Sequence, residues 1–175
     1  MQPLFSKPEL MDKLEKLTRD YAAVLEKVKE RRAAWQQKAK PFLVQYLNEI
    51  TARFPLKWKA GANEMMQSLE AVYLVFDHEP SGIVEQSPFS VVQKMKIGGF
   101  LSFSQTRNGQ IVVWISFPFI DGMTEEKPRN ETIETLEPEE LEPEALNRFI
   151  GKFLEEMIQW EDDARDEIGF IRHRD

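Results

Sequence analysis

Asp77, His78 and Glu79 form the only place in the chain where an imidazole stands between two carboxylates. Such a trio can ligate a metal ion or carry out general acid–base catalysis, because histidine changes its charge near neutral pH. Adjacent residues of an extended chain point to opposite sides, however, and residues 77–82 are typical of a polar turn that ends a strand. An enzyme built on this trio is therefore the weakest of the three hypotheses that the sequence supports.

The rest of the sequence holds no marker of a common reaction. It contains no cysteine, so it forms neither a disulfide nor a thiolate metal site. It also lacks a P-loop, a nucleophile elbow and the glycine pattern of dinucleotide-binding proteins. The sequence therefore predicts no cofactor, no metal and no catalytic residue, and it favours a non-enzymatic protein.

The charge of the chain is concentrated in one segment. Between residues 124 and 144, nine glutamates and two basic residues give a net charge of −7, which equals the net charge of the whole chain. Because phosphate neutralisation requires a basic surface, we expect no nucleic-acid partner. Residues 1–7 lack the features of a signal peptide, and no apolar run approaches the ~20 residues of a membrane span. We therefore expect a cytoplasmic protein without membrane contact.

Two helices are predicted before residue 55, the first of them long and covering residues 8–38. Six apolar residues in the first helix follow one another at spacings of four and three, the heptad pattern of helices that pair with other helices. They are Leu10, Leu14, Leu17, Tyr21, Val24 and Val28. Pro41 lacks a backbone donor, so we expect it to kink or break the helix near Lys40, after which a second helix begins.

Alternating apolar residues predict an antiparallel sheet over residues 55–120. The expected strands begin near residues 56, 69, 88, 100 and 111, with Gly98 and Gly99 as a bend. Asn108 and Gly109 favour a two-residue type I′ turn, which would place Phe103 opposite Trp114. Because both sides of this hairpin carry apolar residues, we expect the sheet to be covered on both faces, the second by the long N-terminal helix, a second subunit or a partner protein.

The remaining segments complete an α+β fold. Residues 121–142 are expected to form a solvated acidic linker, and residues 143–168 a long C-terminal helix packed on the sheet. We therefore predict a single domain over residues 1–175, with residues 7–54 helical and residues 55–120 forming a central antiparallel meander of four to five strands.

Two further hypotheses concern binding. The first is a non-enzymatic protein-interaction module that self-associates through its long helices, as a homodimer, or binds another protein. Residues 7–40 carry a net charge of +4 and residues 145–175 one of −3, which favours helix pairing modestly. The alternative is a small apolar-ligand binding protein with a cavity between the sheet and the C-terminal helix. Its candidate lining residues are Trp58, Tyr73, Phe103, Trp114, Phe153 and Met157.

Overall fold

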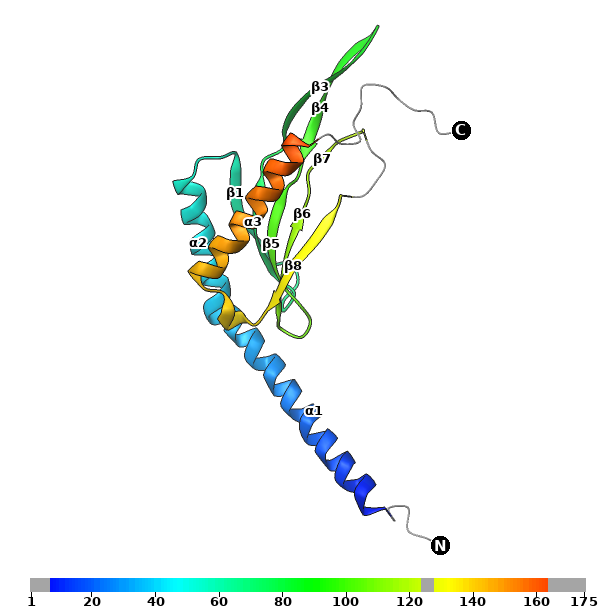
Figure 1. Ribbon diagram of the computed structural model, residues 1–175, viewed down its shortest axis with the longest axis vertical. Helices are drawn as coiled ribbons and strands as arrows, with labels where there is room; N and C mark the ends of the chain where they lie inside the picture. The colour runs from blue at the N-terminus through cyan, green and yellow to red at the C-terminus, as the bar shows by residue number, and fades with distance from the viewer. Residues whose placement is uncertain (1–6, 124–127, 164–175) are drawn as a thin grey trace, which may run out of the picture.

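The chain begins with one continuous helical run. In the computed structural model, which describes residues 7–123 and 128–163, this run comprises α1 (Pro8–Ala34), the π-helical turn η1 (Trp35–Ala39) and α2 (Lys40–Arg53). Figure 1 shows α2 beside the sheet and α1 projecting away from it. The 27 residues of α1 extend over about 40 Å at 1.5 Å per residue. None of the described helices is both long and apolar enough to cross a membrane.

The two predicted N-terminal helices, the first of them long, are present, but Pro41 does not break the run: a π-helical turn joins them. The Lys40 N–H donates to the carbonyl of Trp35, five residues back, which widens one turn. In a regular helix the proline ring clashes with the carbonyl four residues earlier, and the missing N–H removes a hydrogen bond. The wider turn accommodates both effects, and α1 continues into α2.

Antiparallel strands form two sheets. The main sheet has five strands in the order β1-β2-β5-β6-β8, and the second has three in the order β3-β4-β7. The strands of the main sheet are β1 (Trp58–Asn63), β2 (Ala71–Phe76), β5 (Phe100–Gln105), β6 (Ile111–Ser116) and β8 (Asn130–Leu136). Those of the second sheet are β3 (Glu79–Ser87), β4 (Ser90–Ile97) and β7 (Phe119–Ile120). The predicted antiparallel sheet is confirmed, whereas a single meander is wrong.

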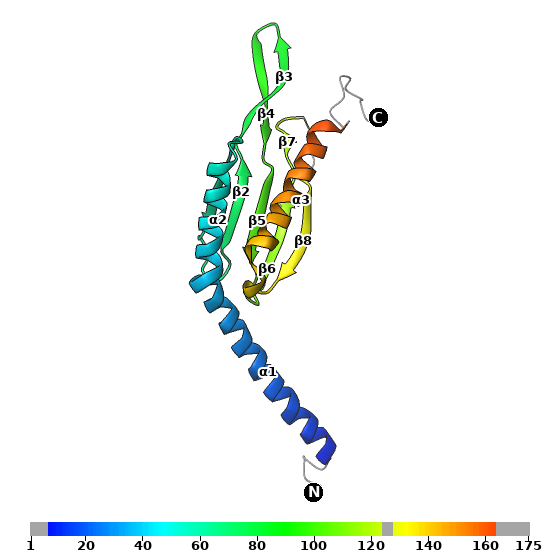
Figure 2. The same ribbon diagram turned by 60° about the vertical axis from the view of Figure 1, so that its left-hand side comes forward.

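Along the chain, the β3–β4 hairpin lies between β2 and β5, two strands that pair with each other in the main sheet. In space, the hairpin extends beyond the end of that sheet as an arm (Figure 2). Gly98 and Gly99 connect β4 to β5 with φ values of +86° and +85°, a conformation that glycine adopts without strain. Of the predicted turn over residues 77–82, only Asp77 and His78 lie outside a strand; β3 begins at Glu79, and its register is irregular between Pro80 and Val84. Such an irregularity lets an edge strand contain a proline.

The turn between β5 and β6 differs from the predicted type I′ turn. Gly109 has a φ of +84°, but Ser68 is the only described residue other than glycine with a positive φ. The Thr106 N–H donates to the carbonyl of Gln110 at 2.8 Å, which closes a three-residue loop. The register is therefore shifted by one residue, and Phe103 lies opposite Val113 rather than Trp114.

Part of the acidic segment predicted as a linker is a strand. β8 pairs with β6, and the 3-10 helix η2 (Pro138–Glu140) follows it. Ile133 and Leu136 pack against the core, whereas Glu131 and Thr135 are exposed. Two glutamates of this segment, Glu131 and Glu134, thus belong to a half-buried strand, where Glu134 pairs with Arg148 of α3 at 3.1 Å.

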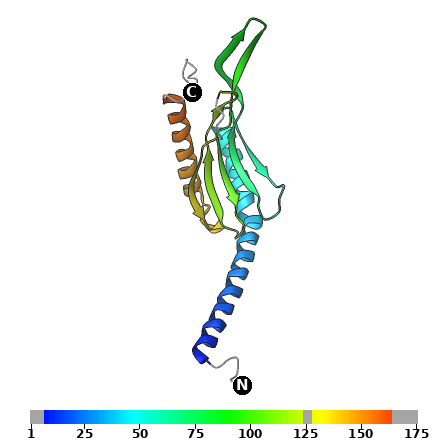
Figure 3. The same cartoon turned by 90° about the vertical axis from the view of Figure 1, so that its right-hand side faces the viewer.

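The hydrophobic core lies on one face of the main sheet, where both α2 and α3 (Pro143–Asp162) pack (Figure 3). The predicted C-terminal helix is confirmed, and it ends at Asp162; residues 164–168 lie outside the described part of the chain. The fully buried residues of the core come from η1, from both helices and from the three strands β2, β5 and β6. They are Trp35, Leu43, Leu47, Leu74, Leu101, Phe103, Ile111, Val113, Ile115, Leu146, Phe149 and Phe153.

The opposite face of the main sheet carries serine, aromatic and valine side chains, and no described helix packs on it. Tyr73, Ser102 and Trp114 lie side by side across three strands of this face. The indole N–H of Trp114 donates to the hydroxyl of Ser104 at 2.8 Å. Phe103 faces the core and Trp114 faces away from it. No described helix provides the predicted second cover, and cover by a second subunit or a partner protein stays a prediction.

Candidate interaction surfaces

Helix α1 carries an apolar stripe that the described chain leaves uncovered. We call Leu10, Leu14, Leu17, Tyr21, Val24 and Val28 the α1 stripe. No residue of α1 is buried among the described residues, and the first five members of the stripe are 47% to 67% exposed. Met11 and Leu25 are also exposed and widen the stripe on one side. Single helices are marginally stable in water, and this spacing is typical of helices that pair.

A salt bridge and contacts with the β5–β6 turn fix the direction in which α1 leaves the sheet. Arg31 donates two hydrogen bonds to the carboxylate of Glu137, from Nε and Nη2, both at 2.7 Å. Arg32 Nη2 donates to the carbonyl of Arg107 in the β5–β6 turn at 2.8 Å. Gly109 in the same turn lies so close to α1 that an added Cβ would be 2.6 Å from the Cβ of Arg31. These contacts hold only the C-terminal end of α1.

Both members of the Arg31–Glu137 pair are charged. The hydrogen bond from Arg31 lowers the pKa of the Glu137 carboxyl below its ordinary value, and Gln110 Nε2 donates a further hydrogen bond at 3.1 Å. The same bond raises the pKa of the Arg31 guanidinium. A carboxyl whose pKa is lowered by folding contributes stability above its unfolded pKa and loses it as the pH falls. The Arg31–Glu137 salt bridge at the C-terminal end of α1 therefore weakens as the pH falls.

A second polar contact joins α2 to the start of the main sheet. Lys40 Nζ lies 2.6 Å from Glu64 Oε1 and 2.7 Å from Glu70 Oε2. The hydrogen bonds to Glu64 and then to Glu70 raise the pKa of Lys40. Gln36 also donates to the carboxylate of Glu70, which is buried. Sequence reasoning missed this group, because no pattern in the chain marks Glu70 as a buried residue.

The trio Asp77, His78 and Glu79 lies at the junction of β2 and β3. Asp77 and His78 are exposed. Glu79 lies 2.8 Å from Lys96 and 3.5 Å from Lys57, and the hydrogen bond from Lys96 lowers the pKa of Glu79. No group of three or more potential metal-ligating His, Asp or Glu residues occurs in residues 7–123 and 128–163.

The six aromatic and apolar residues predicted to line a cavity are not brought together. Phe103, Phe153 and Met157 are buried in the core, where they pack between the sheet and the helices. Tyr73 and Trp114 belong to the opposite face of the sheet. Trp58 lies in an apolar groove that sequence reasoning did not locate.

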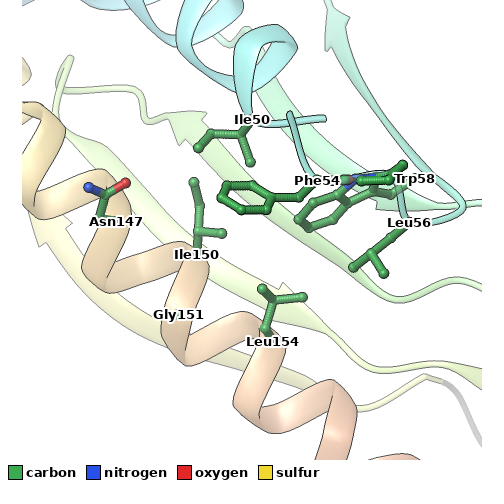
Figure 4. Close-up of a pocket in the computed structure, with 9 residues that line it drawn as sticks. Ile50, Phe54, Leu56, Trp58, Asn147, Ile150, Gly151 and Leu154 are labelled. Atoms are coloured by element: carbon green, nitrogen blue, oxygen red, sulfur yellow. Dashed lines mark hydrogen bonds between the residues drawn. The ribbon is translucent and has the colours of Figure 1, made fainter. Parts of the chain in front are cut away.

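This groove lies between the end of α2 and the outer side of α3, and Figure 4 shows the side chains around it. Its volume of about 490 Å³ is within the range of small-ligand sites. Its lining is almost entirely apolar and consists of Ile50, Phe54, Pro55, Leu56, Trp58, Asn147, Ile150, Gly151 and Leu154. A Cβ added to Gly151 would meet no described atom within 4 Å. Beside the groove, the Tyr46 hydroxyl donates to the side chain of Asn147.

The β3–β4 arm exposes apolar side chains as well. Phe89 at its tip is 99% exposed and Val91 is 71% exposed. The arm is joined to the rest of the protein by pairing of β4 with β7 at Lys96 and Ile97, and by an ion pair of 2.6 Å between Lys96 and Glu161 of α3. A two-stranded hairpin is only marginally stable in water, so the arm depends on these contacts at its base.

No protein-family model matches this chain, and neither a similar curated protein nor a similar solved structure was found for it.

Proposed function

We propose that this protein is a non-enzymatic interaction module that self-associates through helix α1. The observation that carries the proposal is the α1 stripe, six apolar residues in heptad spacing on a helix with no buried residue in the described chain. Six such positions correspond to three heptads, a length sufficient for a two-stranded coiled coil. Exposed apolar surfaces of this extent on soluble proteins are typical of interaction sites.

The size of the stripe also predicts how strong the association is. Completing the burial of a half-exposed leucine-sized side chain contributes on the order of 1 kcal/mol, so the stripes of two copies contribute on the order of 10 kcal/mol. The loss of translational and rotational freedom costs about as much. We therefore expect a dimer whose population depends on protein concentration.

Charged residues in the stripe are expected to abolish this dimer. In the variant Leu14→Glu/Leu17→Glu, two carboxylates in each copy would have to be buried at the helix pair, which is strongly unfavourable. Both residues lie outside the core, so the thermal stability of the sheet domain should not change. Sedimentation equilibrium over a range of concentrations should give a dimer for the unaltered chain and a monomer for the variant.

The matched control is Lys16→Gln/Arg19→Gln, which changes the net charge by the same amount on the polar side of α1. It should associate like the unaltered chain. A protein that stays monomeric at every concentration would reject the proposal, as would a charged-stripe variant that still dimerises.

A second function, binding of a small apolar ligand, is favoured by the groove at Gly151. A glycine in a helix interior costs roughly 1 kcal/mol relative to alanine, and no described side chain uses the space that Gly151 leaves open. The groove has an apolar floor and the amide of Asn147 at its side. We propose an amphiphile with an alkyl chain, such as a fatty acid, as the occupant.

Filling the groove is expected to weaken this binding at least tenfold. In Gly151→Leu the new side chain would occupy the open space, whereas Gly151→Ala leaves most of it free and favours the helix. Titration with dodecanoate, followed by the thermal shift, should give saturable binding to the unaltered chain and to Gly151→Ala but not to Gly151→Leu. Equal binding by all three proteins, or binding by none, would rule out this site.

A further inference from the structure

The apolar side of α1 is also the side on which the sheet domain lies. Leu17 and Trp35 are eighteen residues apart, which is five full turns of an α-helix, so they lie on the same side of the helix. Trp35 is fully buried in the core. Val28 is already partly covered, because the β5–β6 turn lies against it: a Cβ on Gly109 would be 3.3 Å from the carbonyl oxygen of Val28. The sheet domain therefore occupies the stripe side of the helix from Val28 onward.

This placement conflicts with a parallel pair of α1 helices. The helical run continues without a break from α1 through α2. In a parallel pair, the helix of the second copy would run alongside the stripe and continue past Val28 into the space that the β5–β6 turn and η2 fill. An antiparallel second helix would instead bring its N-terminal end to this point, and its sheet domain would lie at the far end of the pair.

We infer that two copies of this chain pair α1 with α1 in antiparallel orientation, with Leu10 of each copy opposite Val28 of the other. The inference rests on the self-association proposed above and specifies its geometry. In this register Leu14 faces Val24 of the second copy and Leu17 faces Tyr21, so all six stripe residues are covered. The contact ends where the sheet domain of each copy begins.

The residues that flank the stripe agree with this orientation. One flank carries Met11, Thr18 and Leu25, and the other carries Lys13, Asp20 and Lys27. In an antiparallel pair each flank faces the same flank of the second copy, so Met11 faces Leu25 and Thr18 faces Thr18. A parallel pair would place the apolar flank against the charged flank. The antiparallel pair also sets Lys13 opposite Lys27 at the solvated edge, where repulsion is weak.

Thiol cross-linking tests the orientation directly, because the chain contains no cysteine. Thr18→Cys places a thiol beside the two-fold axis of the antiparallel pair, and bis-maleimidoethane should join most of the protein into a covalent dimer. Leu10→Cys should give no cross-link, because the two copies of residue 10 would lie about 27 Å apart. Both residues are exposed on α1, so the sheet domain of each variant should fold as before.

The solution mass of the same samples separates this inference from the proposed function. A dimer that cross-links through Thr18→Cys and not through Leu10→Cys supports the antiparallel pair. A dimer that cross-links through Leu10→Cys, or through neither variant, overturns this register and leaves self-association standing. A monomer in solution overturns both.

Discussion

Replacing Gly109 with alanine is expected to lower the free energy of unfolding by about 3 kcal/mol, through backbone strain and overpacking. Gly109 has a φ of +84°, where an L side chain is strained. The new Cβ would also be 2.6 Å from the Cβ of Arg31 and 3.4 Å from the backbone nitrogen of Arg32. Either the β5–β6 turn or α1 must move, so the contacts that orient α1 should be lost as well. Urea denaturation gives the change in stability.

Gly98→Ala is the matched control for the close contact. Gly98 has nearly the same φ, +86°, but its nearest atoms to an added Cβ are 3.9 and 4.0 Å away. The control should therefore show the backbone strain alone, about 1 to 2 kcal/mol. Equal losses in the two variants would mean that the packing of the turn against α1 adds nothing to stability.

Truncating Trp35 is expected to cost about 3 to 5 kcal/mol, the usual range for a fully buried aromatic residue. Trp35 is fully buried at the π-helical turn, where the N-terminal helical run meets the core. Its indole N–H has no hydrogen-bond partner among the described groups. Trp35→Ala should therefore lose the packing of the ring without losing a hydrogen bond, and thermal denaturation should show a large fall in the melting temperature.

Two further variants separate packing from indole chemistry. Trp35→Phe keeps an aromatic ring and removes the unpaired N–H, so it should retain most of the stability that Trp35→Ala loses. Trp160 is only partly buried at the edge of the core, and Trp160→Ala should cost less than half as much. If Trp35→Ala lowered the stability no more than Trp160→Ala does, the packing of Trp35 would not be what holds the helical run against the core.

The parts of the fold that the sequence predicted correctly depend on local periodicity. In α3, Leu146, Ile150, Phe153 and Met157 repeat at helical spacing, and all four are buried in the core. The wrong predictions concern positions where tertiary contacts override a local signal. Pro41 is accommodated by a π-helical turn, and the β5–β6 turn takes three residues because only Gly109 of the Asn-Gly pair adopts a positive φ.

Of the candidate surfaces, one could be predicted from local periodicity and one could not. The α1 stripe could be predicted because its six residues belong to one helix and need only their spacing to be recognised. The groove could not, because α2, α3 and the chain between α2 and β1 each contribute to it, and their approach depends on the whole fold. Gly151 could have indicated the groove, because a glycine inside an amphipathic helix often marks a place where a ligand or another chain segment approaches the backbone closely.

The acidic strand β8 bears on which surfaces of two copies can meet. β8 is an outer strand of the main sheet, and an outer strand offers unpaired backbone groups to which a strand of another molecule can add. Glu131 and Glu134 lie on β8, so two copies approaching edge to edge would bring like charges together. The charge concentrated in this part of the chain thus opposes growth of the sheet into larger aggregates, and it favours the assembly through the uncharged α1 stripe that we propose.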